Sequence, residues 1–167
     1  MVGRFCVDAA SEITNMTNKL MKYQDSPVVA DIENALMVGE QLDESTWGGN
    51  YKNEVANGSS NFGYTTAGVP ESYQVNTLYE MNGYWDKSDV FQEFNNVGCN
   101  LLNHLGHSST TYNMKMSTSD LNTSNFQNNG ITRGFVIGYS QGCYNGAFDN
   151  RESYGYVGDC FSEVITT

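Results

Sequence analysis

The chain has 167 residues, and its 8 Lys and Arg against 19 Asp and Glu give a formal net charge of −11. This length suits one domain and excludes a second full one. An acidic chain with few, scattered basic residues repels phosphate backbones, so we expect no nucleic-acid partner. The longest apolar runs, such as residues 34–39, fall well short of the roughly 18 residues that a membrane-spanning helix needs.

The composition also bears on location. Only 16 % of the residues are charged, and Asn, Ser, Thr, Gly and Tyr make up the balance, which is typical of extracellular or periplasmic domains. Residues 1–5 lack the charged start, apolar stretch and cleavage site of a signal peptide, and they predict an edge strand instead. Residues 159–167 predict the first turns of a helix that ends abruptly. We therefore expect residues 1–167 to be a piece of a longer protein.

The first elements are a helix and a buried strand. Residues 35–39 form a short apolar run that ends at a glycine, which predicts a strand buried on both faces and followed at once by Glu40. Residues 8–24 predict a helix, because apolar side chains recur there every three or four positions along one buried stripe: Ala9, Ile13, Met16, Leu20 and Tyr23.

A strand, helix and strand unit lies in the middle of the chain. Residues 41–74 predict a long polar loop with a short helix near 50–56. The pattern that follows predicts a strand at 75–79, a helix at 87–96 and a strand at 99–105, and such a unit indicates a parallel sheet.

The last predicted strand is 133–139, which follows a second polar loop at 108–132. The alternation of strands and helices predicts an α/β fold, a sandwich with a mostly parallel central sheet flanked by helices. Reactive groups of such folds belong at the carboxyl ends of the strands.

Three apolar strands are each followed by a reactive side chain, namely Glu40, His107 and Cys143. A carboxylate, an imidazole and a thiol at one sheet edge are what nucleophilic catalysis requires. The thiol is the natural nucleophile, His107 can protonate the leaving amine, and Glu40 can fix the tautomer and orientation of the imidazole.

The four cysteines are far apart in the sequence and form no Cys-x-x-Cys pair, which excludes a zinc ribbon and a thioredoxin-type redox pair. Four cysteines allow three disulfide connectivities, which the sequence leaves open. We expect Cys6 and Cys99 to be buried small hydrophobes, because they lie among apolar residues.

His104 and His107 are spaced as His-x-x-His, which raises a metal site as an alternative. Residues three apart on a strand point to opposite faces, so both could bind one ion only if the chain turned at Gly106. No cysteine or acidic cluster adjoins them to complete a zinc site, so we expect no metal there and assign His104 to the core or to a supporting position.

Several segments resemble a known family. Residues 103–108 (Asn-His-Leu-Gly-His-Ser), 142–146 (Gly-Cys-Tyr-Asn-Gly) and 160–163 (Cys-Phe-Ser-Glu) resemble the catalytic segment of gingipain-type cysteine peptidases, which have a caspase-like fold. Residues 2–5 and 35–40 are similar to that family too, so the resemblance covers nearly the whole chain.

The resemblance implies a cysteine endopeptidase that acts on proteins or peptides through an acyl-enzyme. Cys143 would be the nucleophile, His107 the acid/base and Glu40 the accompanying carboxylate, with the backbone N–H groups of Cys143 and Ser108 as the oxyanion hole. Well-known members have Gly-His-Gly where this chain has Gly-His-Ser, so Ser108 must adopt backbone angles open to a residue with a Cβ.

The resemblance also bears on specificity, metal ions and location. Basic-specific members hold the residue before the cut with an acidic pocket residue, for which Asp43, Glu44 and Glu54 are candidates, although each also suits a solvated surface. The chemistry requires no cofactor, and structural calcium in the acidic loops would fit the family. The resemblance and the composition together imply a secreted or cell-surface protein of a bacterium or archaeon.

Two alternatives remain. One is a non-catalytic extracellular module that binds carbohydrate or protein, favoured by the many Trp, Tyr and Asn residues of the loops. The other is a metal-dependent hydrolase at His104 and His107. The sequence does not indicate an oligomeric state.

Overall fold

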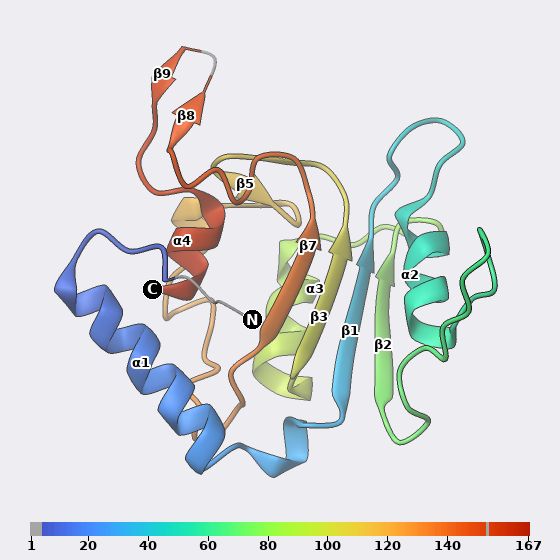
Figure 1. Cartoon of the computed structure of the whole chain (residues 1–167), viewed down its shortest axis with the longest axis horizontal. Coiled ribbons are helices and arrows are strands. Elements are labelled where there is room, and N and C mark those ends of the chain that lie inside the picture. The colour runs from blue at the N-terminus through green and yellow to red at the C-terminus, as the bar shows by residue number, and fades with distance from the viewer. Residues whose placement is uncertain (1–4, 153) are drawn as a thin grey trace.

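A computed structural model describes residues 5–152 and 154–167 of the chain. Its centre is a parallel sheet whose strands follow the order β2-β1-β3-β7 (Figure 1). The apolar run predicted as a buried strand is β1, which lies between β2 and β3 and is buried from Ala35 onward. The strands are β1 (Asn34–Gly39), β2 (Gln74–Tyr79), β3 (Leu101–Leu105) and β7 (Ile137–Gln141).

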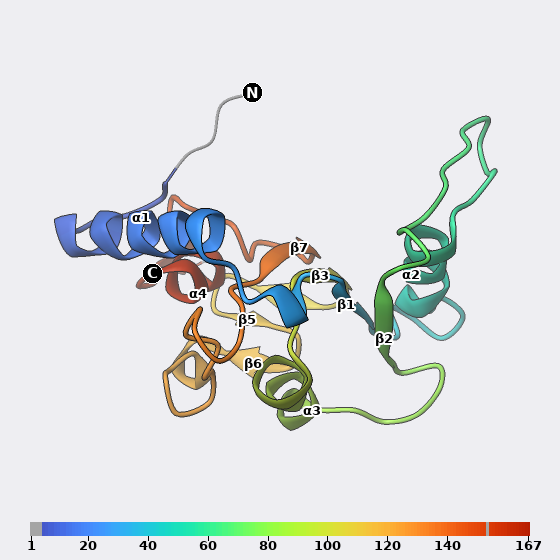
Figure 2. The same cartoon turned by 90° about the horizontal axis from the view of Figure 1, so that it is seen from below.

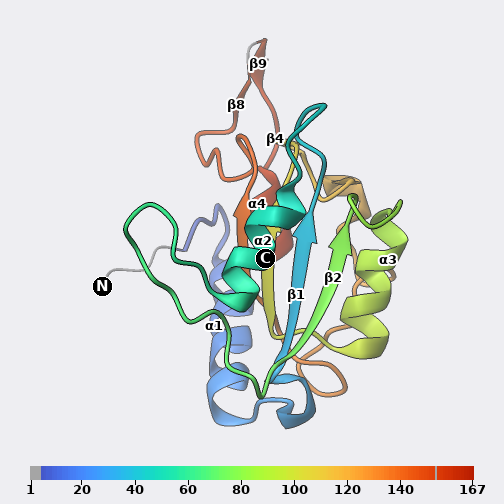
Figure 3. The same ribbon diagram turned by 90° about the vertical axis from the view of Figure 1, so that its right-hand side faces the viewer.

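Two helices pack on opposite faces of this sheet (Figure 3). Because side chains alternate along a strand, Leu36 of β1 packs in a cluster with Val90 of α3, whereas Met37 packs with Ala56 of α2. This confirms the predicted α/β sandwich. The helices are α1 (Ala10–Asp25), α2 (Gly48–Asn57), α3 (Lys87–Gln92) and α4 (Phe161–Thr166), with a π-helical turn at Glu93–Val97 and 3-10 turns at Val29–Asp31 and Thr118–Asp120.

The first helix forms as predicted, but its apolar stripe is not buried. None of the residues of α1 is buried, and Ile13 and Leu20 are each 47 % exposed. The helix lies beside α4, where the Lys19 ammonium donates to the carbonyl of Thr166 at 3.0 Å (Figure 2). The prediction of a helix is therefore correct, and the prediction that its apolar stripe is buried is wrong. Periodicity shows that a helix has an apolar face, but it does not show what covers that face.

The last sheet strand begins four residues later than predicted. Residues 133–136 stay outside the sheet, and the buried Asp31 holds the first two of them. Its carboxylate lies 3.2 Å from the Arg133 guanidinium and accepts from the Gly134 N–H at 2.7 Å. The strand then runs from Ile137 to Gln141 and ends two residues before Cys143.

Five very short strands lie outside the sheet and have no counterpart in the prediction. Two-residue strands give no periodic signal, and the turn between β5 and β6 carries positive φ at Met114 and Lys115 (48° and 60°) instead of the Asn-Gly pair typical of such turns. The strands are β4 (Ser108–Ser109), β5 (Tyr112–Asn113) and β6 (Met116–Ser117) in one small sheet, and β8 (Arg151–Glu152) and β9 (Gly155–Tyr156) in a hairpin.

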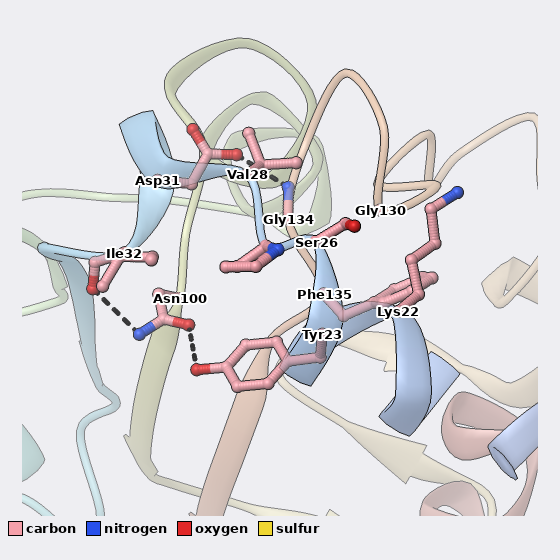
Figure 4. A pocket seen from close by; sticks show the side chains of 11 residues that line it. Lys22, Tyr23, Ser26, Val28, Asp31, Ile32, Asn100, Gly130, Gly134 and Phe135 are labelled. Carbon is pink, nitrogen blue, oxygen red and sulfur yellow. Dashed lines mark hydrogen bonds between the residues drawn. The ribbon is translucent and has the colours of Figure 1, made fainter. Parts of the chain in front are cut away.

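At the amino edge of the sheet lies a cavity of about 10 Å³, which has room for about one water molecule (Figure 4). Its polar groups satisfy one another: the Tyr23 hydroxyl donates to Asn100 at 2.8 Å, and the Asn100 amide donates to the carbonyl of Ile32 at 2.9 Å. These two hydrogen bonds therefore join α1 to the sheet, and the cavity between them is too small for an organic ligand.

The edge strand predicted for residues 1–5 falls largely outside the described residues, and residues 5–7 form no strand. Among the described residues, no helix has the length and apolar character needed to cross a lipid bilayer.

Candidate active site

The register of the sheet aligns three strand ends. Gly39 of β1 pairs with Leu105 of β3, and Leu105 pairs with Gln141 of β7, so the three residues form one row across the sheet. Glu40 follows this row by one residue, and His107 and Cys143 each follow their strand by two. All three predicted catalytic residues therefore lie at the same carboxyl edge, at the arrowheads of Figure 1, on adjacent strands.

The loops that carry His107 and Cys143 are in direct contact. The Ser108 hydroxyl donates to the carbonyl of Cys143 at 2.5 Å, and the N–H of Gly106 donates to the carbonyl of Gln141 at 3.4 Å. Gly142 permits this approach, because a Cβ there would lie 2.3 Å from the Ser108 hydroxyl oxygen. Ser108 lies in β4 and does not have a positive φ, so its backbone suits a residue with a Cβ.

Glu40 is 4 % exposed, and both carboxylate oxygens are bonded. Oε2 accepts from the backbone N–H of His107, and Oε1 lies 3.1 Å from Nε2 of His104. Glu40 thus fixes the main chain at His107, but it makes none of the contacts to the His107 ring that the sequence led us to expect. Gly106 leaves room for the carboxylate, since a Cβ there would lie 2.4 Å from its Cδ.

The His107 ring is oriented by a main-chain carbonyl instead. Its Nε2 lies 2.9 Å from the carbonyl oxygen of Gln41, which can only accept, so Nε2 carries a proton. In the neutral ring this leaves Nδ1 as the acceptor. The His107 side chain is exposed, as a group that exchanges protons with a substrate must be.

His104 is an interior histidine. Its side chain is fully buried, Nδ1 lies 2.8 Å from the Ser140 hydroxyl, and Nε2 lies beside Glu40. Both ring nitrogens are therefore engaged within the protein, which agrees with the supporting position expected for this residue. Across residues 5–152 and 154–167, no three His, Cys, Asp or Glu side chains gather as a metal site would require.

The network around His104 includes three residues that sequence analysis missed. The Ser140 hydroxyl accepts from the side-chain amides of Asn113 at 3.1 Å and Asn145 at 3.0 Å. Asn145 follows Cys143 by two residues, so this network ties the cysteine loop to the interior. His104 in β3 and Ser140 in β7, one polar residue on each of two adjacent strands, are the signal that could have shown a polar contact at this face of the sheet.

All four cysteines are free thiols, and Cys143 differs from the other three in its exposure. It is exposed, and Tyr144 after it has a φ of 59°, in the left-handed region that turns the chain sharply. Cys99 and Cys160 are buried as free cysteines often are, and burial raises the pKa of both thiols, that of Cys99 to about 12. Cys6 is only partly buried, so of the two cysteines predicted to be buried, Cys99 alone is.

An open cavity of about 510 Å³ adjoins His107. Its size suits a peptide side chain or a small ligand. Its wall is held by Lys115, whose ammonium donates to Glu80 at 2.6 Å and to the carbonyl of Trp85 at 2.7 Å. The lining residues are Glu40, Tyr84, Asp86, Lys87, His107, Tyr112 and Lys115.

The acidic residues considered for a specificity pocket do not line this cavity. Asp43 is exposed and accepts from the N–H groups of Ser45 and Thr46, which lower the pKa of its carboxyl within its own turn. Glu54 accepts from the Asn61 side chain at 2.7 Å, and Glu44 is exposed. In the structure Asp43 and Glu44 lie on the solvated surface, and Glu54 is partly buried beside Asn61.

Lys52 was missed by sequence analysis. It lies on α2, is 1 % exposed, and donates at 2.6 Å to the side-chain oxygens of both Asn103 and Gln141. Burial lowers the pKa of its ammonium to about 8. The signal was its spacing in the helix, because Gly48, Lys52 and Ala56 recur every four residues and all are buried.

Comparison with known proteins then assigns the family. The model of the family described as Peptidase family C25 matches residues 1–167. The chain belongs to peptidase family C25. This confirms the gingipain-type resemblance of the chain.

A solved structure gives the same fold. The chain is similar to the crystal structure of the Arg-specific cysteine proteinase gingipain R, with a TM-score of 0.71 and 19 % sequence identity. The match covers 98 % of this chain and 35 % of gingipain R, so the C25 chain spans about a third of that relative's length. The caspase-like fold expected from the sequence is thus confirmed. No curated protein matches the chain.

Proposed function

We propose that this C25 chain carries the catalytic centre of a cysteine endopeptidase. The observation that carries the proposal is the row of strand ends, which brings the loops of His107 and Cys143 together and joins them by the bond from Ser108 to the Cys143 carbonyl. Two independent loops deliver an exposed thiol and an exposed imidazole to one edge. That pairing is what a thiol nucleophile with an acid/base partner needs.

In the proposed reaction the sulfur of Cys143 attacks the carbonyl carbon of the scissile peptide bond, and the thiol proton passes to Nδ1 of His107. The oxyanion is stabilised by the N–H groups of Cys143 and Ser108, and loss of one such donor lowers kcat by about 10²- to 10³-fold in other hydrolases. The C–N bond then breaks, the amine leaves with the proton from His107, and a thioester remains on Cys143.

Water hydrolyses that thioester with His107 acting as the base. The carbonyl of Gln41 stabilises the imidazolium that forms at each stage, because it accepts from Nε2. Glu40 is a positioning residue in this scheme, since it holds the His107 main chain and His104.

We further propose that the chain is part of a longer catalytic domain, that its substrates are proteins or peptides, and that the protein is secreted or displayed at the cell surface. The low charge content, the polar loops and the match to about a third of gingipain R support this proposal. Structural calcium in the acidic loops and a reaction without a cofactor belong to the same proposal.

The test is cleavage of a fluorogenic peptide library by the protein and by two variants. Cys143→Ala and His107→Ala should each lower kcat at least about 10²-fold with unchanged unfolding curves. Iodoacetamide should abolish the activity, and chelators should leave the reaction itself intact. Full activity in the Cys143→Ala variant would refute the proposal. Inactivation by chelation without unfolding would favour the metal hydrolase instead, and glycan or protein binding without cleavage would favour the non-catalytic module.

A further inference from the structure

Lys52 is a buried ammonium that makes no ion pair with a carboxylate in the part of the chain that the structure describes. The chain has 19 acidic residues, yet the two acceptors of Lys52 are the neutral side chains of Asn103 and Gln141. Buried charges in proteins are normally paired with opposite charges. Across the described residues, ion pairs form at Lys87, Lys115 and Arg133, and none forms at Lys52.

The position of Lys52 relates it to the proposed nucleophile. Gln141, which it contacts, is the last residue of β7 and precedes Cys143 by two residues. Two residues of chain span at most about 7 Å. The ammonium of Lys52 therefore contacts a side chain that lies two positions from the proposed nucleophile, in the region where the side chain of a bound substrate residue would pass.

The two sides of this strand end differ in how much room they leave. On the side of Ser140, polar groups of His104, Asn113 and Asn145 fill the space. On the side of α2, Gln141 is exposed and Tyr139 is 58 % exposed, so a substrate side chain can lie against β7 there. Lys52 lies beneath the exposed Gln141 on this side and is itself only 1 % exposed.

We propose that Lys52 selects peptides with Asp or Glu immediately before the scissile bond. The inference rests on the proposed peptidase function and adds the substrate class. The incoming carboxylate takes the place of the Gln141 side-chain oxygen on the Lys52 ammonium, while Asn103 keeps its bond. The substrate thus supplies the negative charge that the protein does not, whereas an Arg or Lys side chain would meet a like charge.

The wild-type protein tests this directly with peptides that differ only in having Asp, Asn or Arg at that position. We expect kcat/KM for the Asp peptide to exceed that for the Asn peptide by about 10- to 150-fold, the factor that a hydrogen bond to a charged group supplies. The matching peptidyl fluoromethyl ketones should alkylate Cys143 with the same order of rates, read by intact mass. A ratio near one, or a preference for Arg, would overturn the inference.

Two variants separate selection from mere positioning of the strand end. In Lys52→Met the Asp-to-Asn ratio should fall to about one. If Lys52 only positioned Gln141, both rates would fall together and the wild-type ratio would persist, which would refute the proposal. Lys22→Met makes the same substitution on α1, at the amino-edge cavity, and should keep the wild-type ratio.

The ketones also separate the two proposals. Selective labelling by the Asp ketone with no cleavage of any peptide would overturn the endopeptidase function and support the acidic site. Cleavage that depends on Cys143 but ignores Asp would support the peptidase and overturn the role of Lys52. Failure of Lys52→Met to fold would leave the wild-type ratios to decide.

Discussion

The Lys52→Met variant should be more stable than the wild-type protein at pH 7. Burial lowers the pKa of Lys52 from 10.5 to about 8. The folded state therefore disfavours the ammonium by about 3 to 4 kcal/mol. Met keeps a chain of similar length without the charge, and it gives up two hydrogen bonds of about 1 kcal/mol each. The net gain is about 1 to 2 kcal/mol.

The stability gain of the Lys52→Met variant should disappear at alkaline pH. Below pH 8 the folded and unfolded chains both hold the Lys52 proton, so the difference between the two proteins is constant. Between about pH 8 and 10.5 the unfolded chain still holds a proton that the folded protein has released, so the stability of the wild type rises with pH relative to the variant. Above that range the wild type keeps its two hydrogen bonds at no charge penalty and should be the more stable protein.

Urea unfolding at pH 7 and pH 10, followed by tryptophan fluorescence, measures both differences. A gain of this size corresponds to about 3 to 6 °C in Tm for a chain of this length. Lys22→Met is the matched control and should not reproduce the inversion with pH. If Lys52→Met were less stable than wild type at pH 7, or if the difference were the same at both pH values, the reasoning from a desolvated ammonium would be wrong.

Three further predictions concern other parts of the structure. Gly142→Ala should lose about 1 to 3 kcal/mol and most of the peptidase rate, because its Cβ would meet the Ser108 hydroxyl; adding Ser108→Gly should restore stability in urea unfolding but only part of the rate, because it also removes the hydroxyl that bonds the Cys143 carbonyl, and an unaffected single variant would contradict this. Iodoacetamide at pH 7.5 should label Cys143 but not Cys99, whose pKa burial raises to about 12, and mass mapping of a labelled native Cys99 would refute the burial argument. Asp31→Asn should lose about 2 to 3 kcal/mol by urea unfolding without lowering kcat per folded molecule, since it lies at the opposite edge of the sheet; a fall in kcat would count against that separation.

The elements that place the site could be predicted because their signals are local. One short apolar run ends just before Glu40 and another ends at Leu105, and these runs predict strands. The strand, helix and strand unit indicates a parallel sheet, in which β1 lies between the two strands of that unit. Each reactive residue then follows from its distance to a strand end. The row from Gly39 through Leu105 to Gln141 required one further fact, the order of the strands, which no single segment contains.

The contacts that orient the site could not be predicted, because their signals are distant or absent. The partner of the His107 ring is the main-chain carbonyl of Gln41, and every residue has a carbonyl. Asn113 contacts Ser140 because the chain reverses direction at Met114 and Lys115. Neither residue is a Gly or Asn, the types that normally indicate such a turn. These pairings arise from tertiary structure, which sequence spacing does not encode.

Lys52 was missed for a different reason. The helix that carries it was expected at 50–56 and is observed at Gly48–Asn57, so its element was found. A charged residue in a polar loop is normally solvated, so this general rule gave no reason to expect that Lys52 is buried. The exception is informative because a desolvated charge lowers stability, so a lysine kept in such a position points to a use at the site.

The spacing between thiol and imidazole depends on the interior of the sheet more than on the loops that carry them. Glu40 holds the main chain of His107 and the ring of His104, and His104 reaches Asn145 in the cysteine loop through Ser140. Buried polar groups tolerate few arrangements, because each lost partner leaves a desolvated atom. A shift of β7 against β3 would therefore break the contact between Ser140 and His104, so the same network that stabilises the sheet resists a displacement of Cys143 from His107.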